Sequence, residues 1–211
     1  MNKIPTLYLR DWDNDPEYIT RTPNLSALWV FANEGIATRK YDGTCVMFDG
    51  DCWWARREVK GHQTAPSNFV QTTEPDPNTN RVMGWIPMEN SQYERFWREA
   101  TSDGNALWWA PGTYELCGPR IGRNPEFLDD YMLYKHSEAQ QLQLQLTNHN
   151  ELSFDLLWHY VVYLKLAQNI EGIVWHHKTD PTKMAKIKAL DFKHIRGLHD
   201  YLPTNSSQLQ Q

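Results

Sequence analysis

Short strand-like runs separated by Asp-Gly turn signals constrain the fold of this chain more than any other feature. Residues 36–48 read as two strands around a turn at residues 41–43, and a second turn signal follows at residues 49–51. A third strand-like run continues from Cys52 to Arg56. Asp-Gly is a common hairpin signal. The pattern therefore predicts short successive strands joined by tight turns.

The rest of the chain adds strands and two helices. Residues 108–118, interrupted at Pro111-Gly112, and residues 131–135 also read as strands. Residues 153–168 carry apolar side chains at the spacing of an amphipathic helix, and a capping-box pattern at Ser91 starts a short helix that extends to Ala100. The length of 211 residues predicts one domain, or one domain with a small appendage, and we place it over residues 1–202. We expect an α+β fold. Residues 60–80 read as a loop and residues 203–211 as a disordered tail.

Composition limits where the chain acts and what it binds. The sequence has no run of 18 apolar residues that could span a membrane, and its N-terminus lacks the apolar segment of a signal peptide. Its 3 cysteines lack C-x-x-C spacing, which favours thiols in a reducing compartment. We expect no membrane partner and an intracellular, cytoplasmic location, or a virus-encoded protein acting in the host cytoplasm. The formal net charge of −5 argues against tight, non-specific nucleic-acid binding, although cations cluster locally.

A lysine precedes the first turn. Lys40 stands three residues before Gly43, with Asp42 between them. A neutral lysine amine held against a nucleotide α-phosphate can displace pyrophosphate and leave a phosphoramidate, and lysine shifts its pKa readily when it is desolvated or set beside other cations. The spacing alone is weak evidence, because Asp-Gly is also a common hairpin turn.

Three further motifs follow Lys40 in order. Glu115 lies in a short apolar run, and Glu171 opens another strand-like run. Lys186 and Lys188 lie on one face of a predicted strand, because side chains alternate with a period of two. The order lysine, acid, acid, paired lysines resembles motifs I, III, IV and V of the covalent nucleotidyltransferases. That superfamily contains ATP-dependent DNA ligases, RNA ligases and mRNA capping enzymes.

Four segments narrow this resemblance to one family. They are T-x-K-x-D-G-T-C at residues 38–45, W-A-R at 54–56, G-W-I-P-M-E at 84–89 and E-G-I-V-W-H at 171–176. These segments are similar to the vertebrate-type 5′–3′ RNA ligase family, and the similarity covers residues 36–198 discontinuously. One departure is Lys186, where that family tends to have an apolar residue. The departure leaves open which of the two lysines dominates.

The resemblance implies a fold and an activity. The fold is an ATP-grasp-like nucleotidyltransferase domain with antiparallel sheets flanked by helices. The activity is that of an ATP-dependent RNA ligase, which joins RNA 5′-phosphate and 3′-hydroxyl ends through a lysyl-AMP and an adenylylated RNA. ATP would be the substrate and Mg²⁺ or Mn²⁺ the metal. Residues 189–211 are too few for the C-terminal OB domain of most DNA ligases, which favours an RNA ligase made of little more than the catalytic domain. We expect a monomer.

The resemblance also implies roles for single residues. Lys40 would be the nucleophile, Glu115 would accept hydrogen bonds from ribose hydroxyls, and Glu171 would hold the divalent cation. Lys186 and Lys188 would neutralise charge that builds at the α-phosphate and favour the neutral amine of Lys40 by like-charge repulsion. Further nucleotide contacts would come from Thr38, Asp42, Gly43, Arg56 by paired hydrogen bonds to phosphate or ribose oxygens, and Tyr134 (or Tyr131) by stacking on the base.

Structural interpretations and other functions compete with these roles. Lys40 could lie in a surface turn, Glu115 could pair with an arginine, and Tyr134 could be core packing. The chain could also be a minimal DNA ligase, another covalent nucleotidyltransferase such as a GTP-using capping enzyme, or a non-catalytic RNA-end binding module. A decayed module is expected to lose at least one of the four motif residues, and Lys40, Glu115, Glu171 and Lys188 are all present.

Overall fold

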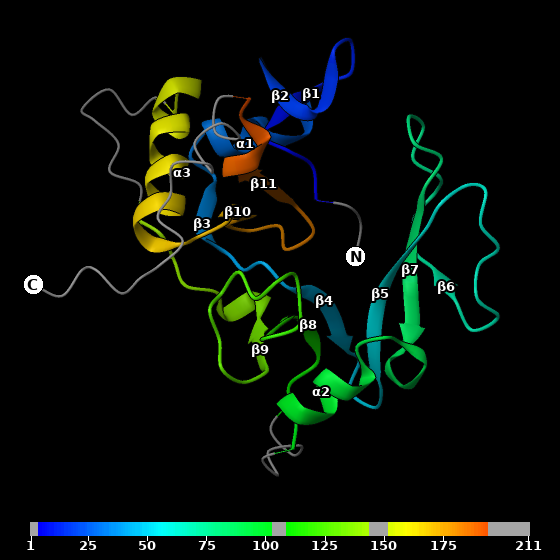
Figure 1. Cartoon of the computed structure of the whole chain (residues 1–211). Coiled ribbons are helices and arrows are strands. Elements are labelled where there is room, and N and C mark those ends of the chain that lie inside the picture. The colour runs from blue at the N-terminus through cyan, green and yellow to red at the C-terminus, as the bar shows by residue number, and fades with distance from the viewer. Residues whose placement is uncertain (1–3, 103–108, 144–151, 194–211) are drawn as a thin grey trace, which may run out of the picture. The chain divides into compact units, whose positions relative to one another are not determined.

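The structure is a computed structural model that describes residues 4–102, 109–143 and 152–193, and the chain divides into two compact units (Figure 1). Residues 4–40 and 141–193 form one unit, which we call the lysine unit. The described residues between 41 and 140 form the other, which we call the glutamate unit. The division falls at the peptide bond between Lys40 and Tyr41. The expectation of a single domain stays a prediction.

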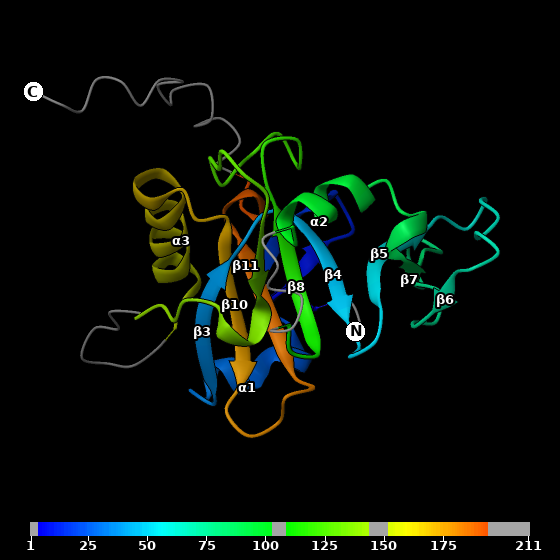
Figure 2. The ribbon, with the colours of Figure 1, turned by 90° about the horizontal axis from the view of Figure 1, so that it is seen from below.

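The lysine unit contains a three-stranded sheet, a two-stranded hairpin and one long helix. The sheet has the order β11-β10-β3, with both pairs antiparallel, and Figure 2 shows α3 alongside β3. The hairpin pairs β1 with β2. The elements are β1 (Tyr8–Asp11), β2 (Asp15–Pro23), α1 (Leu28–Phe31), β3 (Gly35–Lys40), α3 (Phe154–Gln168), β10 (Gly172–His177) and β11 (Met184–Lys188), with 3₁₀ turns at Leu25–Ala27 and Ala189–Asp191.

Helix α3 packs on one face of this sheet. Its N-cap Ser153 accepts a hydrogen bond from the Leu156 N–H at 3.2 Å, and the helix ends at Asn169, whose φ of 52° is left-handed. Three buried side chains at helical spacing form its inner stripe: Leu157, Val161 and Leu164. They share a core with Ile173, Trp175, Ala185 and Ile187 of the sheet.

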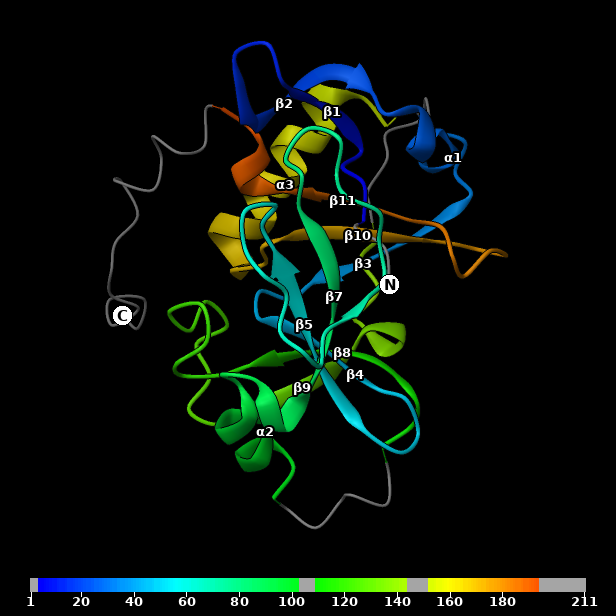
Figure 3. The same ribbon diagram turned by 90° about the vertical axis from the view of Figure 1, so that its right-hand side faces the viewer.

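The glutamate unit is built on a six-stranded antiparallel sheet with its own core. The strand order is β6-β7-β5-β4-β8-β9, and Figure 3 shows β5 and β7 side by side. The core includes Val46, Ala55, Ile86, Tyr114 and Leu116. The elements are β4 (Thr44–Phe48), β5 (Trp53–Val59), β6 (Val70–Gln71), β7 (Val82–Pro87), α2 (Glu94–Ala100), β8 (Gly112–Cys117) and β9 (Met132–Lys135), with 3₁₀ turns at Met88–Asn90 and His136–Glu138.

Most predicted elements are present, and the α+β class with antiparallel sheets is confirmed. The pairing expected around residues 41–43 is wrong, because β3 pairs with β10 whereas β4 pairs with β5 and β8. Helix α2 begins at Glu94 without a side-chain cap, since the Ser91 hydroxyl accepts the Tyr93 N–H instead. The predicted loop at 60–80 contains the short strand β6. The predicted tail at 203–211 lies outside the described residues.

Two further observations concern membrane spans and cysteines. In the part of the chain that the structure describes, no helix is long and apolar enough to cross a membrane. The three cysteines all lie in described segments, and no disulfide joins them.

Candidate functional site

One face of the three-stranded sheet carries all three motif lysines. Lys40 and Lys188 each lie opposite Gly172 on the central strand, and Lys186 lies opposite Val174. Residues that face each other across antiparallel strands point to the same side. The alternate residues, Ile173 among them, are buried against α3 on the other side. The predicted shared face of Lys186 and Lys188 is therefore confirmed, and Lys40 joins it.

Gly172 allows this close spacing. A Cβ atom on Gly172 would lie 2.1 Å from the Ile187 carbonyl oxygen and 2.8 Å from the Lys188 Cα. No side chain fits at such a distance without moving the backbone of β11. Glu171 thus supplies the acid, and the adjacent Gly172 leaves room for the backbone of β11 to approach β10.

Glu171 connects two of the lysines. Its carboxylate forms an ion pair with the Lys40 ammonium through Oε2, and its Oε1 lies 3.4 Å from Lys188 Nζ. Glu171 is 8% exposed, and a buried carboxylate is stable when cations and hydrogen bonds compensate its charge. The ion pair holds the amine of Lys40 at a defined place on the sheet.

Lys186 is electrostatically perturbed by its surroundings. Burial, followed by the charges of Lys40 and Lys188, lowers the pKa of Lys186 from 10.5 to about 8. The N-terminal segment sits against this residue: the Lys186 N–H donates to the Pro5 carbonyl at 2.9 Å, and the Leu7 N–H donates to the Lys186 carbonyl at 2.8 Å. Sequence patterns carried no signal for this contact.

A buried acid supports the end of β11. Asp191 is 1% exposed and accepts the Lys188 N–H at 2.8 Å through Oδ2. Its Oδ1 accepts a hydrogen bond from Arg10 Nη2 of the hairpin at 2.7 Å. Arg10 and Asp191 were missed by the sequence reasoning, because Arg10 lies 181 positions away in a segment that matched no motif.

Thr38 lies on the same strand face as Lys40, two residues before it. It is 6% exposed, and its hydroxyl donates to the Val174 carbonyl at 2.9 Å. In this arrangement the hydroxyl supports the pairing of β3 with β10. Its predicted part in adenine recognition stays a prediction.

The glutamate unit holds the residues that follow Lys40. The Asp42 N–H donates to Glu126 at 2.9 Å, and the Gly43 N–H donates to Glu115 Oε1 at 3.1 Å. A Cβ atom on Gly43 would lie 2.4 Å from the Leu116 carbonyl oxygen, so only glycine fits against β8. Asp42 and Gly43 thus present a turn that Glu115 fastens to the sheet.

Arg56, expected as a nucleotide contact, lies in β5 and lines a pocket of about 340 Å³. The pocket also contains Arg57, Ser91 and Tyr93. The Arg56 Nε is buried with no hydrogen-bond partner. Arg57 follows on the exposed side of the strand and also lines this pocket. The arrangement offers guanidinium donors to an anionic or hydroxylated ligand.

Tyr134 lies opposite Glu115 in the β8–β9 register. Its ring stacks on Tyr41, with 4.2 Å between ring centroids and 5° between ring planes. One face of the Tyr134 ring is therefore covered by the residue directly after Lys40. A base stacked on Tyr134 would use the other face or displace Tyr41.

The lysine unit offers the Glu171 carboxylate to a hard divalent cation. Mg²⁺ usually binds through one or two carboxylates, several waters and substrate phosphates, and Glu171 offers such a carboxylate. Two ammonium groups already contact that carboxylate, so a cation there would be held mainly by phosphate and water oxygens.

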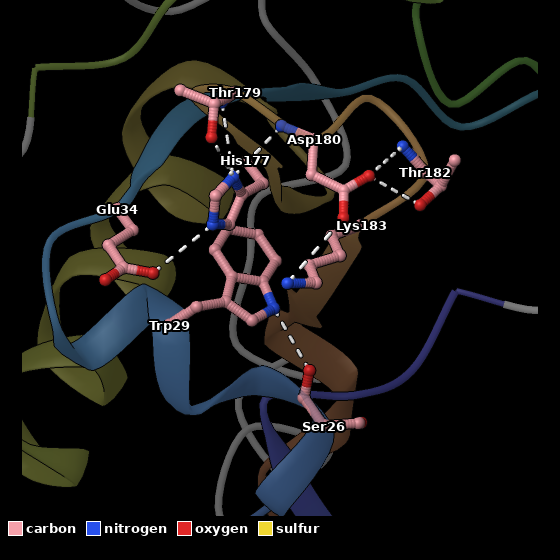
Figure 4. A network of polar contacts seen from close by, with 8 residues as sticks. All are labelled: Ser26, Trp29, Glu34, His177, Thr179, Asp180, Thr182 and Lys183. Atoms are coloured by element: carbon pink, nitrogen blue, oxygen red, sulfur yellow. Dashed lines mark hydrogen bonds and ion pairs between the residues drawn. The ribbon is translucent and has the colours of Figure 1, made fainter.

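A second polar network in the lysine unit closes the connection from β10 to β11 (Figure 4). His177 Nδ1 accepts the N–H groups of Thr179 and Asp180 at 3.2 and 3.1 Å, so its proton sits on Nε2, which is 3.2 Å from Glu34. Asp180 in turn accepts the N–H and hydroxyl of Thr182. The donors and acceptors of this network thus pair with one another, and the network fixes the turn that precedes Lys186.

The predicted residues thus form two groups. Lys40, Glu171, Lys186 and Lys188 come together on one sheet face, with Thr38 beside them, whereas Asp42, Gly43, Arg56, Glu115 and Tyr134 belong to the glutamate unit. A scan against protein-family models finds no match to this chain, and a search of curated proteins finds none either.

Proposed function

We propose that this chain is an ATP-dependent RNA ligase with a covalent nucleotidyltransferase fold. One observation carries the proposal: Lys40 at the end of β3, Lys188 at the end of β11 and Glu171 directly before β10 meet as one charged cluster. A lysine between an acid and other lysines is suited to attack a phosphorus atom, because the acid orients the amine and the cations attract the phosphates.

The first step forms a covalent intermediate. The neutral Lys40 Nζ attacks the α-phosphorus of ATP, a P–N bond forms, and the P–O bond to pyrophosphate breaks. Lys186 and Lys188 stabilise the negative charge that develops on the phosphoryl oxygens. Mg²⁺, when bound with the nucleotide, would neutralise phosphate charge near Glu171. The Lys40 ammonium gives up one proton before the attack, the resulting amine gives up another as the P–N bond forms, and both protons pass to solvent.

Two further transfers complete ligation. An oxygen of an RNA 5′-phosphate attacks the α-phosphorus, so the P–N bond breaks and AMP is joined to the RNA through a phosphoanhydride. The 3′-hydroxyl of a second end then attacks the 5′-phosphorus, a phosphodiester forms, and AMP leaves. In the glutamate unit, Glu115 would accept ribose hydroxyls, Arg56 would bind ribose or phosphate oxygens, and Tyr134 would stack on adenine.

Covalent labelling tests the proposal. The protein is incubated with α-labelled ATP and Mg²⁺ and separated on a denaturing gel, and we expect an acid-labile adduct. Lys40→Ala and Lys40→Arg should both abolish it, since arginine stays protonated and cannot act as the nucleophile. Lys188→Ala should slow labelling and Lys186→Ala should slow it less.

The control variant is Lys183→Ala, because Lys183 is exposed and pairs with Asp180 at 3.6 Å. It should label like the unmodified protein. Label that persists on Lys40→Ala would refute the assignment of the nucleophile.

A further inference from the structure

His136 links two side chains of β8 in the glutamate unit. Thr113 and Glu115 lie two positions apart on that strand and so share a face. The imidazole spans them: Nδ1 is 2.9 Å from the Thr113 hydroxyl oxygen and Nε2 is 3.0 Å from Glu115 Oε2. No sequence motif pointed to His136, which directly follows β9.

The ionised carboxylate of Glu115 decides which atoms donate and which accept in the Thr113–His136–Glu115 contacts. An ionised Glu115 can only accept, so the proton that it meets belongs to His136 Nε2. Nδ1 then accepts the Thr113 O–H when the ring is neutral, or donates to the same oxygen when the ring is charged. Thr113 can serve either state, because a hydroxyl both donates and accepts. The imidazole therefore keeps its orientation in both charge states.

Glu115 is held at both oxygens and still has acceptor capacity. Oε1 accepts the Gly43 N–H at 3.1 Å, and Oε2 accepts His136. Each carboxylate oxygen has about two acceptor positions, so roughly one remains on each. Two fixed, neighbouring acceptors match the paired 2′- and 3′-hydroxyls of a ribose.

We propose that His136, oriented by Thr113, is a positioning residue that fixes the Glu115 carboxylate and thereby sets a preference for ribonucleotides over 2′-deoxyribonucleotides. The inference rests on the proposed function of Glu115 as the ribose contact. A preorganised acceptor needs no rearrangement on binding, and a site built to bond a hydroxyl rejects an analogue that lacks it. A loosely held carboxylate could instead turn to solvent and lose that selectivity.

Glu115 and His136 could instead take part in metal binding together with Cys45, because the Cys45 thiol lies within 4.8 Å of their ligand atoms. Such a trio could hold a thiophilic metal ion. Metal ligation needs a thiolate, whereas burial, with the nearby Glu115 charge, raises the pKa of the Cys45 thiol to about 12. Positioning of Glu115 is therefore the role that the geometry and the charges favour, and metal binding becomes an outcome of the test.

The test compares lysyl-adduct formation from ATP and from 2′-dATP. The unmodified protein should show a higher kcat/KM with ATP. His136→Ala should lower the ATP to 2′-dATP ratio about tenfold, mainly through a higher KM for ATP, as expected for a lost hydrogen bond to a charged group. His136→Gln should restore part of the ratio, because its amide N–H takes the place of Nε2–H. Thr113→Val should lower the ratio less.

His159→Ala is the matched control, because His159 is an exposed histidine of α3. Thermal unfolding of each variant separates lost folding from lost selectivity. An unchanged ratio in folded His136→Ala overturns the positioning role, and so does a ratio that requires added Zn²⁺ or collapses with a chelator selective for it.

Calorimetric binding of the two nucleotides separates this inference from the proposed function. If no adduct forms from either nucleotide, yet ATP binds more tightly than 2′-dATP and His136→Ala removes the difference, the ligase chemistry fails and the positioning role stands. If the adduct forms on Lys40 but both nucleotides bind equally to the protein and to His136→Ala, only the positioning role fails. If neither nucleotide binds, both are wrong.

Discussion

Lys40 and Glu171 form an ion pair although 131 positions separate them in the sequence. The antiparallel pairing of β3 with β10 creates it, because Lys40 lies opposite Gly172, the neighbour of Glu171. The same carboxylate faces Lys188 at 3.4 Å on the other side. One acid therefore balances two lysines from the two outer strands of the sheet.

Removing the Glu171 charge should weaken both of its proposed effects, the orientation of Lys40 and the binding of Mg²⁺. Glu171→Gln keeps the shape of the side chain but loses the ion pair with Lys40 and the carboxylate that favours Mg²⁺. We expect the labelling rate to fall at least about tenfold and its dependence on Mg²⁺ concentration to weaken. Initial rates over a Mg²⁺ series measure both effects.

The control for that experiment is Glu99→Gln, which alters an exposed ion pair with Arg95 on α2. It should leave the rate and the Mg²⁺ series unchanged. A Glu171→Gln protein with the unmodified Mg²⁺ dependence would contradict the metal role.

The buried ammonium of Lys186 should lower the free energy of unfolding at neutral pH. Its pKa in the folded protein is about 8, below the ordinary 10.5, so between these values the unfolded chain binds more protons than the folded one. Stability then rises with pH across that window, and below it the charged lysine destabilises the fold by roughly 3 kcal/mol. Lys186→Met should therefore be more stable than the unmodified protein at pH 7, and the gain should shrink towards pH 10.

Urea unfolding at several pH values measures that difference, with Lys183→Met at an exposed position as the control. A Lys186→Met protein that is less stable at pH 7, or a gain that grows with pH, would be inconsistent with the buried charge.

Arg10 should matter far more than another arginine of the same hairpin. Arg10→Met leaves the Asp191 carboxylate, whose side chain is 2% exposed, without its cation, which should cost about 3 kcal/mol of unfolding free energy. Arg21→Met removes a pair with Asp155 whose side chains are 67% and 65% exposed, so the loss of unfolding free energy should be much smaller, because water screens exposed ion pairs. Denaturant unfolding compares them directly. Equal losses would show that Asp191 does not depend on Arg10.

Ligation of matched strands should identify the substrate. We expect sealing to require a 5′-phosphate and a 3′-hydroxyl, and RNA at the 3′ side to outperform DNA, because the 2′-hydroxyl adds a donor and an acceptor. With a net charge of −5, affinity should be modest and fall with salt. The assay uses all-RNA, all-DNA and mixed strands at two salt concentrations. Equal sealing of DNA nicks would indicate a minimal DNA ligase, and a Lys40 adduct without sealing would indicate another acceptor of AMP.

Local patterns predicted the elements well where few competing arrangements exist. The period of two placed Lys186 and Lys188 on one strand face, and the apolar spacing over residues 153–168 placed α3. The turn at residues 41–43 was harder. Asp-Gly specifies a change of direction but not the partner of each flanking strand, and here β3 and β4 enter different sheets.

The resemblance of the motif order to the covalent nucleotidyltransferases singled out Lys40, Glu171 and Lys188 as candidates. Alternation along a strand, which is a local property of the backbone, placed Lys186 and Lys188 on one face. The meeting of Lys40 and Lys188 around the Glu171 carboxylate depends on strand register, which is set by packing between distant segments. The same holds for Asp191 with Arg10 and for His136 with Glu115. Such side-chain pairs leave no periodic trace in the sequence, so only tertiary structure could reveal them.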